Sequence, residues 1–506
     1  MASLVAQVPI LLLISFDGFR HDYLSPALTP NLYALSQRST VGNMRSLYVT
    51  KTYPNHFSIA TGLYVDEHEI INNKMYDPTL AQPTFKPSTT AREWWDPHNR
   101  TVPIWTANQL LGDDRVSGSM MYPGSVTPYQ GMVPVHLKPF DTVRNWTLNI
   151  DTVIQWLTDE LMPANFVSVY FDNPDHTAHI FGPFSSQVHE SLLELDHAVG
   201  YLMHRLQAEH LAQRTNVIFV SDHGMAQVSK RVYLDKLIDT SLFELYGASP
   251  VWSLWLKPNA MNMKIIIYKK LKRLARQNHF QVYKRNEIPQ IYHYSKTPRI
   301  GHLLLVSDEG YDIYANASVD WTIDSTVWGN HGWSPTSEDM RPLFMATGPA
   351  FRAGYYHEHP FPNIDLFPLM CYILELPLRK LPNNGSLERI SDMLATEELY
   401  RLTDSVVATD NNHHNSIGLV PVILGGIVLL IGGAMCMTCV ASCARAKPKI
   451  DYDIDSLAPG LNIDLEFYLD HAGNKQQQRF GKTTLAINQS TSHKRVPEEF
   501  RLLLHN

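Results

Sequence analysis

Aspartate and histidine side chains recur in this 506-residue chain where apolar segments end. Three aspartates follow such segments: Asp17 follows Val8 to Phe16, Asp175 comes shortly after Phe166 to Phe171, and Asp222 follows Asn216 to Ser221. Short apolar runs followed by turns are typical of buried parallel strands, and ligands of α/β sheets gather beyond the carboxyl ends of the strands. With His179, His223 and His331 the aspartates could supply three ligands to each of two metal ions, and Asp and His ligands suit zinc.

The spacing within these segments favours convergence. Asp175 and His179 are four residues apart, so one helical turn places both on the same face. Asp222 and His223 are adjacent and can reach one ion from a turn. A single Asp-Gly pair or a single one of the 23 histidines would carry little weight. The prediction of a two-metal site rests on their joint occurrence.

Thr52 precedes Tyr53 and Pro54, and proline is favoured in the first turn of a helix. Its simplest role is a helix N-cap. A hydroxyl at a helix N-terminus also lies where phosphate groups bind, and a threonine hydroxyl near a metal ion can become a nucleophile. His56 is one turn further on, and we expect it to be a packed helix histidine rather than a general base.

The segments SFDGFR, TKTYPNH, PDHTAH, SDHGM and GNHG, in this order, resemble the ectonucleotide pyrophosphatase/phosphodiesterase family of the alkaline phosphatase superfamily. The resemblance extends from about Val8 to about Leu387. It implies an alkaline phosphatase-like α/β fold with a mostly parallel central sheet, and two zinc ions. One zinc would be bound by Asp175, His179 and His331, and the other by Asp17, Asp222, His223 and the oxygen of Thr52.

The resemblance also implies roles around the metals. Thr52 would attack phosphorus and form a phospho-threonine intermediate, Asn73 would donate to the substrate phosphate, and Tyr53 and Phe140 would stack on a nucleobase. In MMYPGS, Tyr122 stands where the family has tryptophan. Two further positions depart from the family, since Glu69 and Ala178 stand where glycine is usual. If the turn at Glu69 has a positive φ, glutamate there is strained.

The order of apolar and amphipathic segments up to residue 225 predicts an α/β fold with helices on both faces of the sheet. Residues 230–330 are expected to form an inserted subdomain carried on the same sheet, and residues 380–409 to form closing helices. We divide the chain into a catalytic domain (8–405), a linker (406–416), a transmembrane helix (417–437) and a cytoplasmic tail (438–506).

Residues 417–437 are uncharged, and a helix of that length spans roughly 31 Å. Arg445, Lys447 and Lys449 follow it, which predicts a single-pass type I protein of the plasma membrane with an extracellular catalytic domain. Glycosylation sequons lie at Asn99, Asn145, Asn316 and Asn384, and Cys436, Cys439 and Cys443 are candidates for palmitoylation. No basic segment precedes Val8, so we expect the sequence to be incomplete upstream.

The remaining composition excludes some classes of partner. A net charge of −7 argues against a nucleic-acid polymer as ligand. The basic cluster from Met263 to Gln277 has the apolar spacing of an amphipathic helix with a solvated cationic face. Cys371 is the only cysteine before the predicted membrane span, so no disulfide can form within that part, and its apolar neighbours predict burial.

The leading prediction is a cell-surface phosphodiesterase that acts on a small nucleotide and releases a 5′-monophosphate. A lysophospholipid or choline phosphodiesterase of the same family keeps the metals and changes the substrate. A catalytically silent surface receptor would have lost a ligand, yet all six Asp and His ligands and Thr52 are present. A phosphomonoesterase is disfavoured because no phosphate-binding arginine of that branch is identifiable. The oligomeric state is left open.

Overall fold

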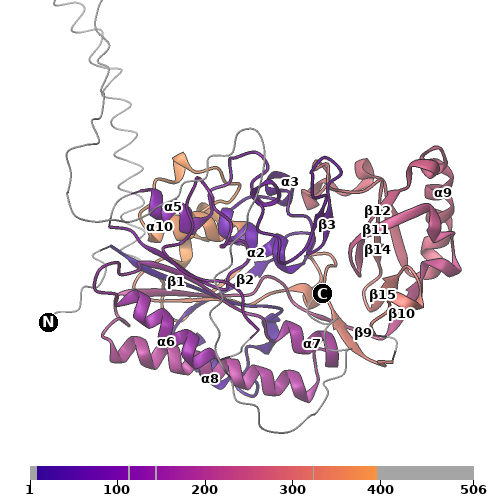
Figure 1. Ribbon diagram of the computed structural model, residues 1–506. Coiled ribbons are helices and arrows are strands. Elements are labelled where there is room, and N and C mark those ends of the chain that lie inside the picture. The colour runs from indigo at the N-terminus through magenta and orange to yellow at the C-terminus, as the bar shows by residue number, and fades with distance from the viewer. Residues whose placement is uncertain (1–7, 112–113, 143–144, 323, 396–506) are drawn as a thin grey trace, which may run out of the picture. The chain divides into compact units, whose positions relative to one another are not determined.

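A central eight-stranded sheet forms the framework of the computed structural model, which describes residues 8–111, 114–142, 145–322 and 324–395 (Figure 1). In spatial order its strands are β18 (Tyr355–Pro362), β2 (Thr40–Arg45), β17 (Phe344–Thr347), β8 (Thr215–Val220), β1 (Ile10–Phe16), β7 (Phe166–Phe171), β5 (Ser117–Met120) and β6 (His136–Lys138). Only β17 runs antiparallel to its neighbours. The predicted mostly parallel α/β sheet is confirmed.

The middle of the sheet is the apolar strand β1, every residue of which is buried. It pairs in parallel with β7 on one side and β8 on the other. Phe16 lies opposite Phe171, and Ser15 lies opposite Val220, so the three strands end at nearly the same level. The residues that follow these strands therefore begin at one edge of the sheet.

Helices cover both faces of the sheet, as predicted (Figure 1). One layer contains α1 (Pro30–Ser36), α6 (Trp146–Leu157), α7 (Asp175–Phe181) and α8 (Ser186–Ala208), and the other contains α2 (Thr52–Thr61), α5 (Ile104–Leu110) and α10 (Leu366–Ile373). Short elements α3 (Val65–His68), α4 (Arg92–Trp95), β3 (Met75–Tyr76) and β4 (Thr84–Phe85) lie between α2 and α5 in the chain.

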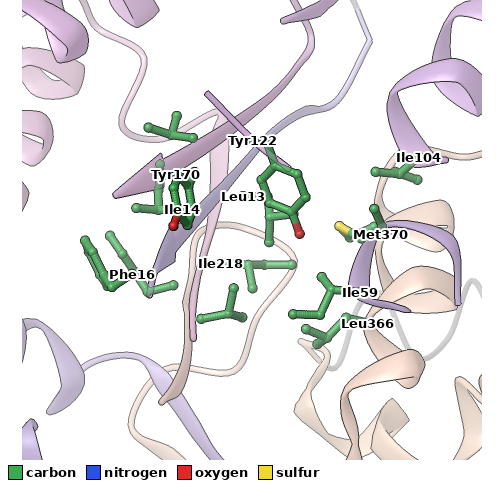
Figure 2. Packing of buried hydrophobic residues seen from close by; sticks show 14 of the residues in the cluster. Leu13, Ile14, Phe16, Ile59, Ile104, Tyr122, Tyr170, Ile218, Leu366 and Met370 are labelled. Carbon is green, nitrogen blue, oxygen red and sulfur yellow. The ribbon is translucent and has the colours of Figure 1, made fainter. Parts of the chain in front are cut away.

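The second helical layer is held to the sheet by apolar packing (Figure 2). Ile59 of α2, Ile104 of α5 and Met370 of α10 are fully buried in the same cluster as Leu13 of β1. Burying a side chain of this size contributes roughly 1.5–3 kcal/mol relative to exposure. Cys371 lies in the same helix as Met370 and is buried, as expected, where burial raises the pKa of its thiol.

Residues 226–330, which lie between β8 and β17 in the chain, form the expected inserted subdomain, which has its own apolar core and its own sheet rather than extending the central one. That sheet contains β11 (Phe243–Ala248), β12 (Val251–Leu256), β14 (Leu303–Ser307) and β13 (Phe280–Tyr283). Two further pairs are β10 (Lys230–Tyr233) with β15 (Tyr311–Tyr314) and β9 (Ala226–Val228) with β16 (Trp328–Asn330). The predicted amphipathic helix is α9 (Lys264–Ala275), which buries Ile267 and Leu271.

The end of the described chain differs from expectation. Instead of closing helices, the described residues 378–395 contain only short 3₁₀ turns at Leu378–Lys380 and Glu388–Met393, because Pro382 and Gly385 interrupt any longer helix there. Residues 396–506, with the predicted linker, membrane span and tail, lie outside the described residues. Among the helices that are described, none has the length and apolar character needed to cross a bilayer.

Candidate active site

The carboxyl edge of the sheet brings the three aspartates together. Asp17 follows β1 directly, Asp175 begins α7 just after β7, and Asp222 lies two residues after β8. The backbone N–H of Gly18 donates to Asp222 Oδ1 at 3.2 Å. Gly18 has a φ of 65°, and a Cβ there would lie 2.9 Å from the Cβ of Asp175, so this junction requires glycine.

One group of candidate metal ligands consists of Asp175, His179 and His331. Asp175 and His179 share a face of α7, with 3.4 Å between Asp175 Oδ2 and His179 Nε2. His331 follows β16, and its Nε2 lies 3.4 Å from Asp175 Oδ1 and 3.2 Å from His179 Nε2. The structure thus brings together the ligands predicted for one metal.

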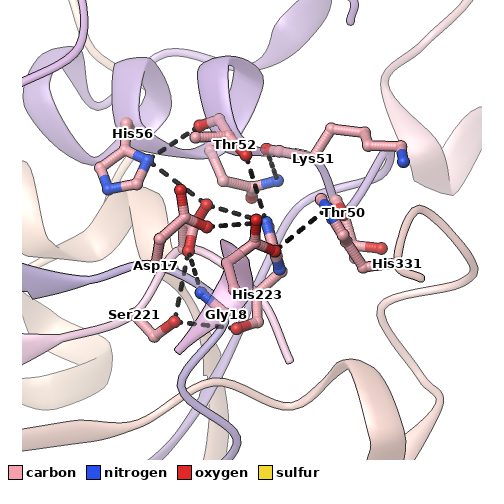
Figure 3. Close-up of polar contacts among 12 residues, drawn as sticks. Asp17, Gly18, Thr50, Lys51, Thr52, His56, Ser221, His223 and His331 are labelled. Atoms are coloured by element: carbon pink, nitrogen blue, oxygen red, sulfur yellow. Dashed lines mark hydrogen bonds and ion pairs between the residues drawn. The ribbon is translucent and has the colours of Figure 1, made fainter. Parts of the chain in front are cut away.

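The ligands predicted for the other metal also converge (Figure 3). His223 Nε2 lies 3.3 Å from Asp17 Oδ1, 3.0 Å from Asp222 Oδ2 and 3.4 Å from Thr52 Oγ1. The ligand atoms of Asp17, Asp175 and His223 lie within 4.8 Å of one another, so Asp175 is close to both groups.

The three histidines all present the same ring nitrogen to this cluster. Their Nδ1 atoms lie 2.9, 2.8 and 2.8 Å from backbone carbonyls, those of Gly329 for His179, Thr50 for His331 and Gly224 for His223. A carbonyl only accepts, so Nδ1 carries the proton and the Nε2 lone pair is available. Metal-binding histidines are oriented in this way in proteins.

The carboxylates fit a cationic occupant. Among the described residues, Asp17 Oδ1, Asp175 Oδ1 and Asp222 Oδ2 are buried without a hydrogen-bond partner. Burial and the neighbouring charges of Asp222 and Asp175 raise the pKa of Asp17 well above its usual range. Buried oxygens of this kind are costly unless a cation or donor meets them. The donor set of carboxylate oxygens and neutral imidazoles suits divalent zinc.

The imidazoles are suited to binding as neutral ligands. Burial lowers the pKa of His179, and burial together with the charges of His223 and Lys51 lowers the pKa of His331 well below its usual value. Burial also acts against protonation of His223, but the Asp222 carboxylate outweighs it and raises the pKa of His223. A positive ion between these groups would reverse that last preference.

Thr52 is the first residue of α2, and Lys51 rather than Thr52 holds the cap position, so the simple capping role does not apply. The Thr52 hydroxyl lies 3.4 Å from His223 Nε2 and 3.4 Å from the side-chain nitrogen of Asn73. Asn73 in turn accepts from the backbone N–H of Tyr53 at 3.0 Å, which fixes the orientation of its amide. The predicted nucleophile and the predicted phosphate donor are therefore neighbours.

His56 is fully buried, as expected of a packed histidine, but it also contacts a candidate ligand. Its Nδ1 lies 2.9 Å from the Thr52 carbonyl and 3.4 Å from Asp222 Oδ2. That nitrogen therefore carries its proton and cannot take one from the Thr52 hydroxyl. Tyr170, which the sequence did not single out, donates to Asp17 Oδ2 at 2.5 Å. No motif marks Tyr170, because it is one aromatic residue within a buried strand.

The predicted nucleobase residues lie at the edge of the site. Tyr53 is half-buried, with its ring 5.7 Å from that of Trp95. Phe140 is 54% exposed, with its ring 6.2 Å from that of Tyr170. Tyr122 is instead buried, and its hydroxyl donates to the His56 carbonyl at 3.1 Å.

The two departures from the family pattern are structural. Glu69 ends α3 with a φ of 60°, the left-handed conformation that glycine adopts more easily. Its carboxylate lies 3.3 Å from His98 Nε2. Ala178 is buried in α7 against β16, where a Cβ on Gly329 would lie 2.4 Å from the Ala178 carbonyl oxygen. Neither residue supplies a ligand atom.

Comparison with known proteins agrees with this geometry. A family model described as type I phosphodiesterase/nucleotide pyrophosphatase matches residues 11–334. The bis(5′-adenosyl)-triphosphatase ENPP4 of Bos taurus is 35% identical over 405 residues, 79% of this chain and 85% of that protein. Ectonucleotide pyrophosphatase/phosphodiesterase family member 5 of Homo sapiens is 32% identical over 437 residues, 83% and 87% of the two chains.

Solved structures give the same result. The structure of murine family member 5 superimposes with a TM-score of 0.70 at 32% identity, covering 76% of this chain and all of that one. A second structure of the murine protein, an inactive threonine-to-alanine variant in complex with AMP, also has a TM-score of 0.70. The chain belongs to the ectonucleotide pyrophosphatase/phosphodiesterase family of the alkaline phosphatase superfamily, whose members are hydrolases of nucleotide pyrophosphate and phosphodiester bonds.

Proposed function

We propose that this chain is a zinc-dependent hydrolase that cleaves a nucleotide pyrophosphate or phosphodiester bond and releases a nucleoside 5′-monophosphate. The observation that carries the proposal is the position of the Thr52 hydroxyl, 3.4 Å from both His223 Nε2 and the Asn73 amide at the start of α2. A relative acts on bis(5′-adenosyl) triphosphate by name, and a structural neighbour loses activity when a threonine becomes alanine and binds AMP. Both support a nucleotide substrate.

The residues suggest how each part of the reaction is performed. Bound by Asp175, His179 and His331 on one side and by Asp17, Asp222, His223 and Thr52 on the other, two zinc ions would favour ionisation of the Thr52 hydroxyl and offset phosphate charge. Thr52 Oγ1 forms a bond to phosphorus while the bond to the leaving oxygen breaks. The Asn73 amide donates to a phosphate oxygen, where charge develops. Water then cleaves the phospho-threonine ester, which restores the hydroxyl and releases the monophosphate.

We assign recognition of the nucleobase to the aromatic residues at the edge of the site. Tyr53 directly follows Thr52 in the chain, the Phe140 ring lies 6.2 Å from that of Tyr170, and both residues offer rings on which a base can stack. His56 and Tyr170 hold Asp222 and Asp17 in place rather than touching substrate.

We also propose that the enzyme acts at the plasma membrane as a type I protein, anchored by residues 417–437. The support is the sequence of that segment and the positive residues after it. The exposed side chains of Asn99, Asn145 and Asn384 support glycosylation on the same side as the catalytic domain.

An assay with three chromogenic esters tests the function. The purified chain is incubated with p-nitrophenyl thymidine 5′-monophosphate, p-nitrophenyl phosphorylcholine and p-nitrophenyl phosphate, each with chelator and after zinc is restored. We expect turnover of the nucleotide ester, its loss with chelator and its recovery with zinc. Turnover of the choline ester alone would instead identify a choline phosphodiesterase. A folded, zinc-loaded chain that cleaves none of the three would be a silent receptor.

A further inference from the structure

A buried carboxylate of the inserted subdomain, Asp312 in β15, accepts several side-chain donors at once. Its Oδ1 accepts from Ser249 Oγ at 2.6 Å and from Asn330 Nδ2 at 2.7 Å. Its Oδ2 accepts from Trp328 Nε1 at 2.6 Å and from the Tyr314 hydroxyl at 3.2 Å. Four donors around a fully buried carboxylate satisfy it as an acceptor and hold it in one orientation.

Asp312 fixes the amide of Asn330, the residue immediately before the candidate ligand His331. Because the Asn330 nitrogen must face the carboxylate, its oxygen must face the opposite way. That oxygen accepts from the backbone N–H of His331 at 2.8 Å and from the ammonium of Lys51 at 3.2 Å. A flipped amide would place a nitrogen against both donors and lose both hydrogen bonds.

The second branch of the network also reaches Lys51. Ser249 donates its hydroxyl to Asp312, and the Ser249 carbonyl accepts from the Lys51 ammonium at 2.8 Å. Lys51 is buried, 3% exposed, and is covalently joined to Thr52. The ammonium is therefore held by oxygens of two residues, Ser249 and Asn330, that Asp312 itself positions.

These contacts link one carboxylate to both sides of the active site. His331 is one of the candidate ligands grouped with Asp175. Lys51 directly precedes Thr52, whose hydroxyl lies beside His223. The link operates even if no other described part of the inserted subdomain contacts the reacting atoms. We infer that Asp312 is a positioning residue, which sets the placement of His331 and of the Lys51–Thr52 peptide through Asn330 and Ser249. The inference rests on the proposed function, because it concerns the metal centre and nucleophile of that reaction.

The variant Asp312→Asn tests the inference with almost no change in volume. The side-chain NH2 group of the new asparagine must face at least one of the four donors. When Asn330 turns its own amide in response, His331 and Lys51 lose their hydrogen bonds to its oxygen. We expect zinc affinity, measured by chelator competition, to fall about 10–100-fold, the range seen when supporting partners of metal ligands are removed. kcat for the nucleotide ester should fall by a similar factor of roughly 10–100. KM should change little, because Asn73, Tyr53 and Phe140 are outside the network.

The matched control is Asp320→Asn in the same subdomain. Asp320 is also buried and accepts from Thr322 and Tyr233, with Arg231 at 3.0 Å, but it contacts neither Asn330 nor Ser249. We expect Asp320→Asn to lower thermal stability while zinc affinity stays at the wild-type value. Equal loss of zinc affinity in both variants would make the effect general destabilisation and overturn the inference.

A second variant, Asn330→Ser, breaks the link while leaving Asp312 in place, and gives the answer if Asp312→Asn does not fold. It should weaken zinc binding and lower kcat in the same direction. If a folded Asp312→Asn or Asn330→Ser chain keeps the wild-type zinc affinity and kcat, the inference is overturned and the proposed function is not affected. A wild-type chain that binds no zinc and cleaves no ester would overturn the proposed function, and this inference with it.

Discussion

The side-chain nitrogen of Asn73 lies 3.4 Å from the hydroxyl oxygen of Thr52, and the Asn73 oxygen accepts from the backbone N–H of Tyr53. The donor is thus held beside the nucleophile before any substrate arrives. A donor that needs no rearrangement is most effective where charge develops during the reaction.

Asn73→Ala should therefore lower kcat for the nucleotide ester about 10²–10³-fold, as removal of one oxyanion donor does in other hydrolases. Steady-state kinetics measure this, and zinc content should stay unchanged because Asn73 is not among the candidate ligands. Asn43→Ala, which removes an amide of β2 that donates to the Glu358 carbonyl, is the control. A wild-type kcat in Asn73→Ala would remove Asn73 from the reaction.

Thr52→Ala should lower turnover by at least about 10³-fold, because its loss removes the group that bonds to phosphorus. Thr52→Ser keeps a hydroxyl at the same place and should retain measurable turnover. Acid-quenched reactions followed by mass spectrometry should show, in the wild type and not in Thr52→Ala, a Thr52 peptide that carries the nucleoside monophosphate through its phosphorus. Comparable rates in Thr52→Ala and wild type would exclude the nucleophilic role.

Phe140→Ala should raise KM for the nucleotide ester roughly fivefold and leave kcat nearly unchanged, because stacking on a base contributes about 1 kcal/mol or more and Phe140 is half exposed. The choline ester has no base, so its kinetics should not change. Leu161→Ala, at an 87% exposed apolar residue, is the matched surface control. If KM for both esters rises equally, Phe140 does not recognise the base.

Stability should depend on pH through His68, which is fully buried and is not a candidate metal ligand. Burial, reinforced by Arg299, lowers the pKa of His68 to about 3 in the folded chain. Between pH 3 and the unfolded value of 6.5 the unfolded chain binds a proton that the folded chain does not, so stability is lost as pH falls through this range. From neutral pH to pH 5 the loss from this group is about 2 kcal/mol.

Urea unfolding of wild type and His68→Gln at pH 7 and pH 5 measures this difference. Glutamine can keep the hydrogen bonds that His68 makes with Ser58 and the backbone N–H of Ile70, but it does not titrate. The acid-induced loss should therefore be smaller in His68→Gln by about 2 kcal/mol. The same loss in both chains would mean that other groups control the acid sensitivity.

The sequence predicted the central strands and the convergence of the candidate ligands because both depend on local patterns. Runs such as Val8 to Phe16 have few alternatives to a buried strand, and an aspartate at the end of each run is visible in the sequence. Asp175 and His179 were predicted to share a helical face from their spacing alone, and they do.

Contacts between distant segments were not predictable in this way. Tyr170 was hidden because a tyrosine in an apolar strand has no distinctive neighbours, yet the fold places its hydroxyl on Asp17. Asp312 lies in a segment without a motif, and its proposed role follows only from the distant side chains of Ser249 and Asn330 that the fold brings to its carboxylate. The separate sheet of the insert likewise depends on long-range strand pairing, which apolar spacing does not reveal.

The long separation between His223 and His331, with the whole inserted subdomain between them, has a consequence for biosynthesis. As the ribosome makes the chain from its N-terminus, five of the six Asp and His candidate ligands are translated before this subdomain, and the sixth only after it. A nascent polypeptide therefore cannot assemble the complete centre until the subdomain has been made. Catalytic competence is thereby postponed to a late stage of synthesis.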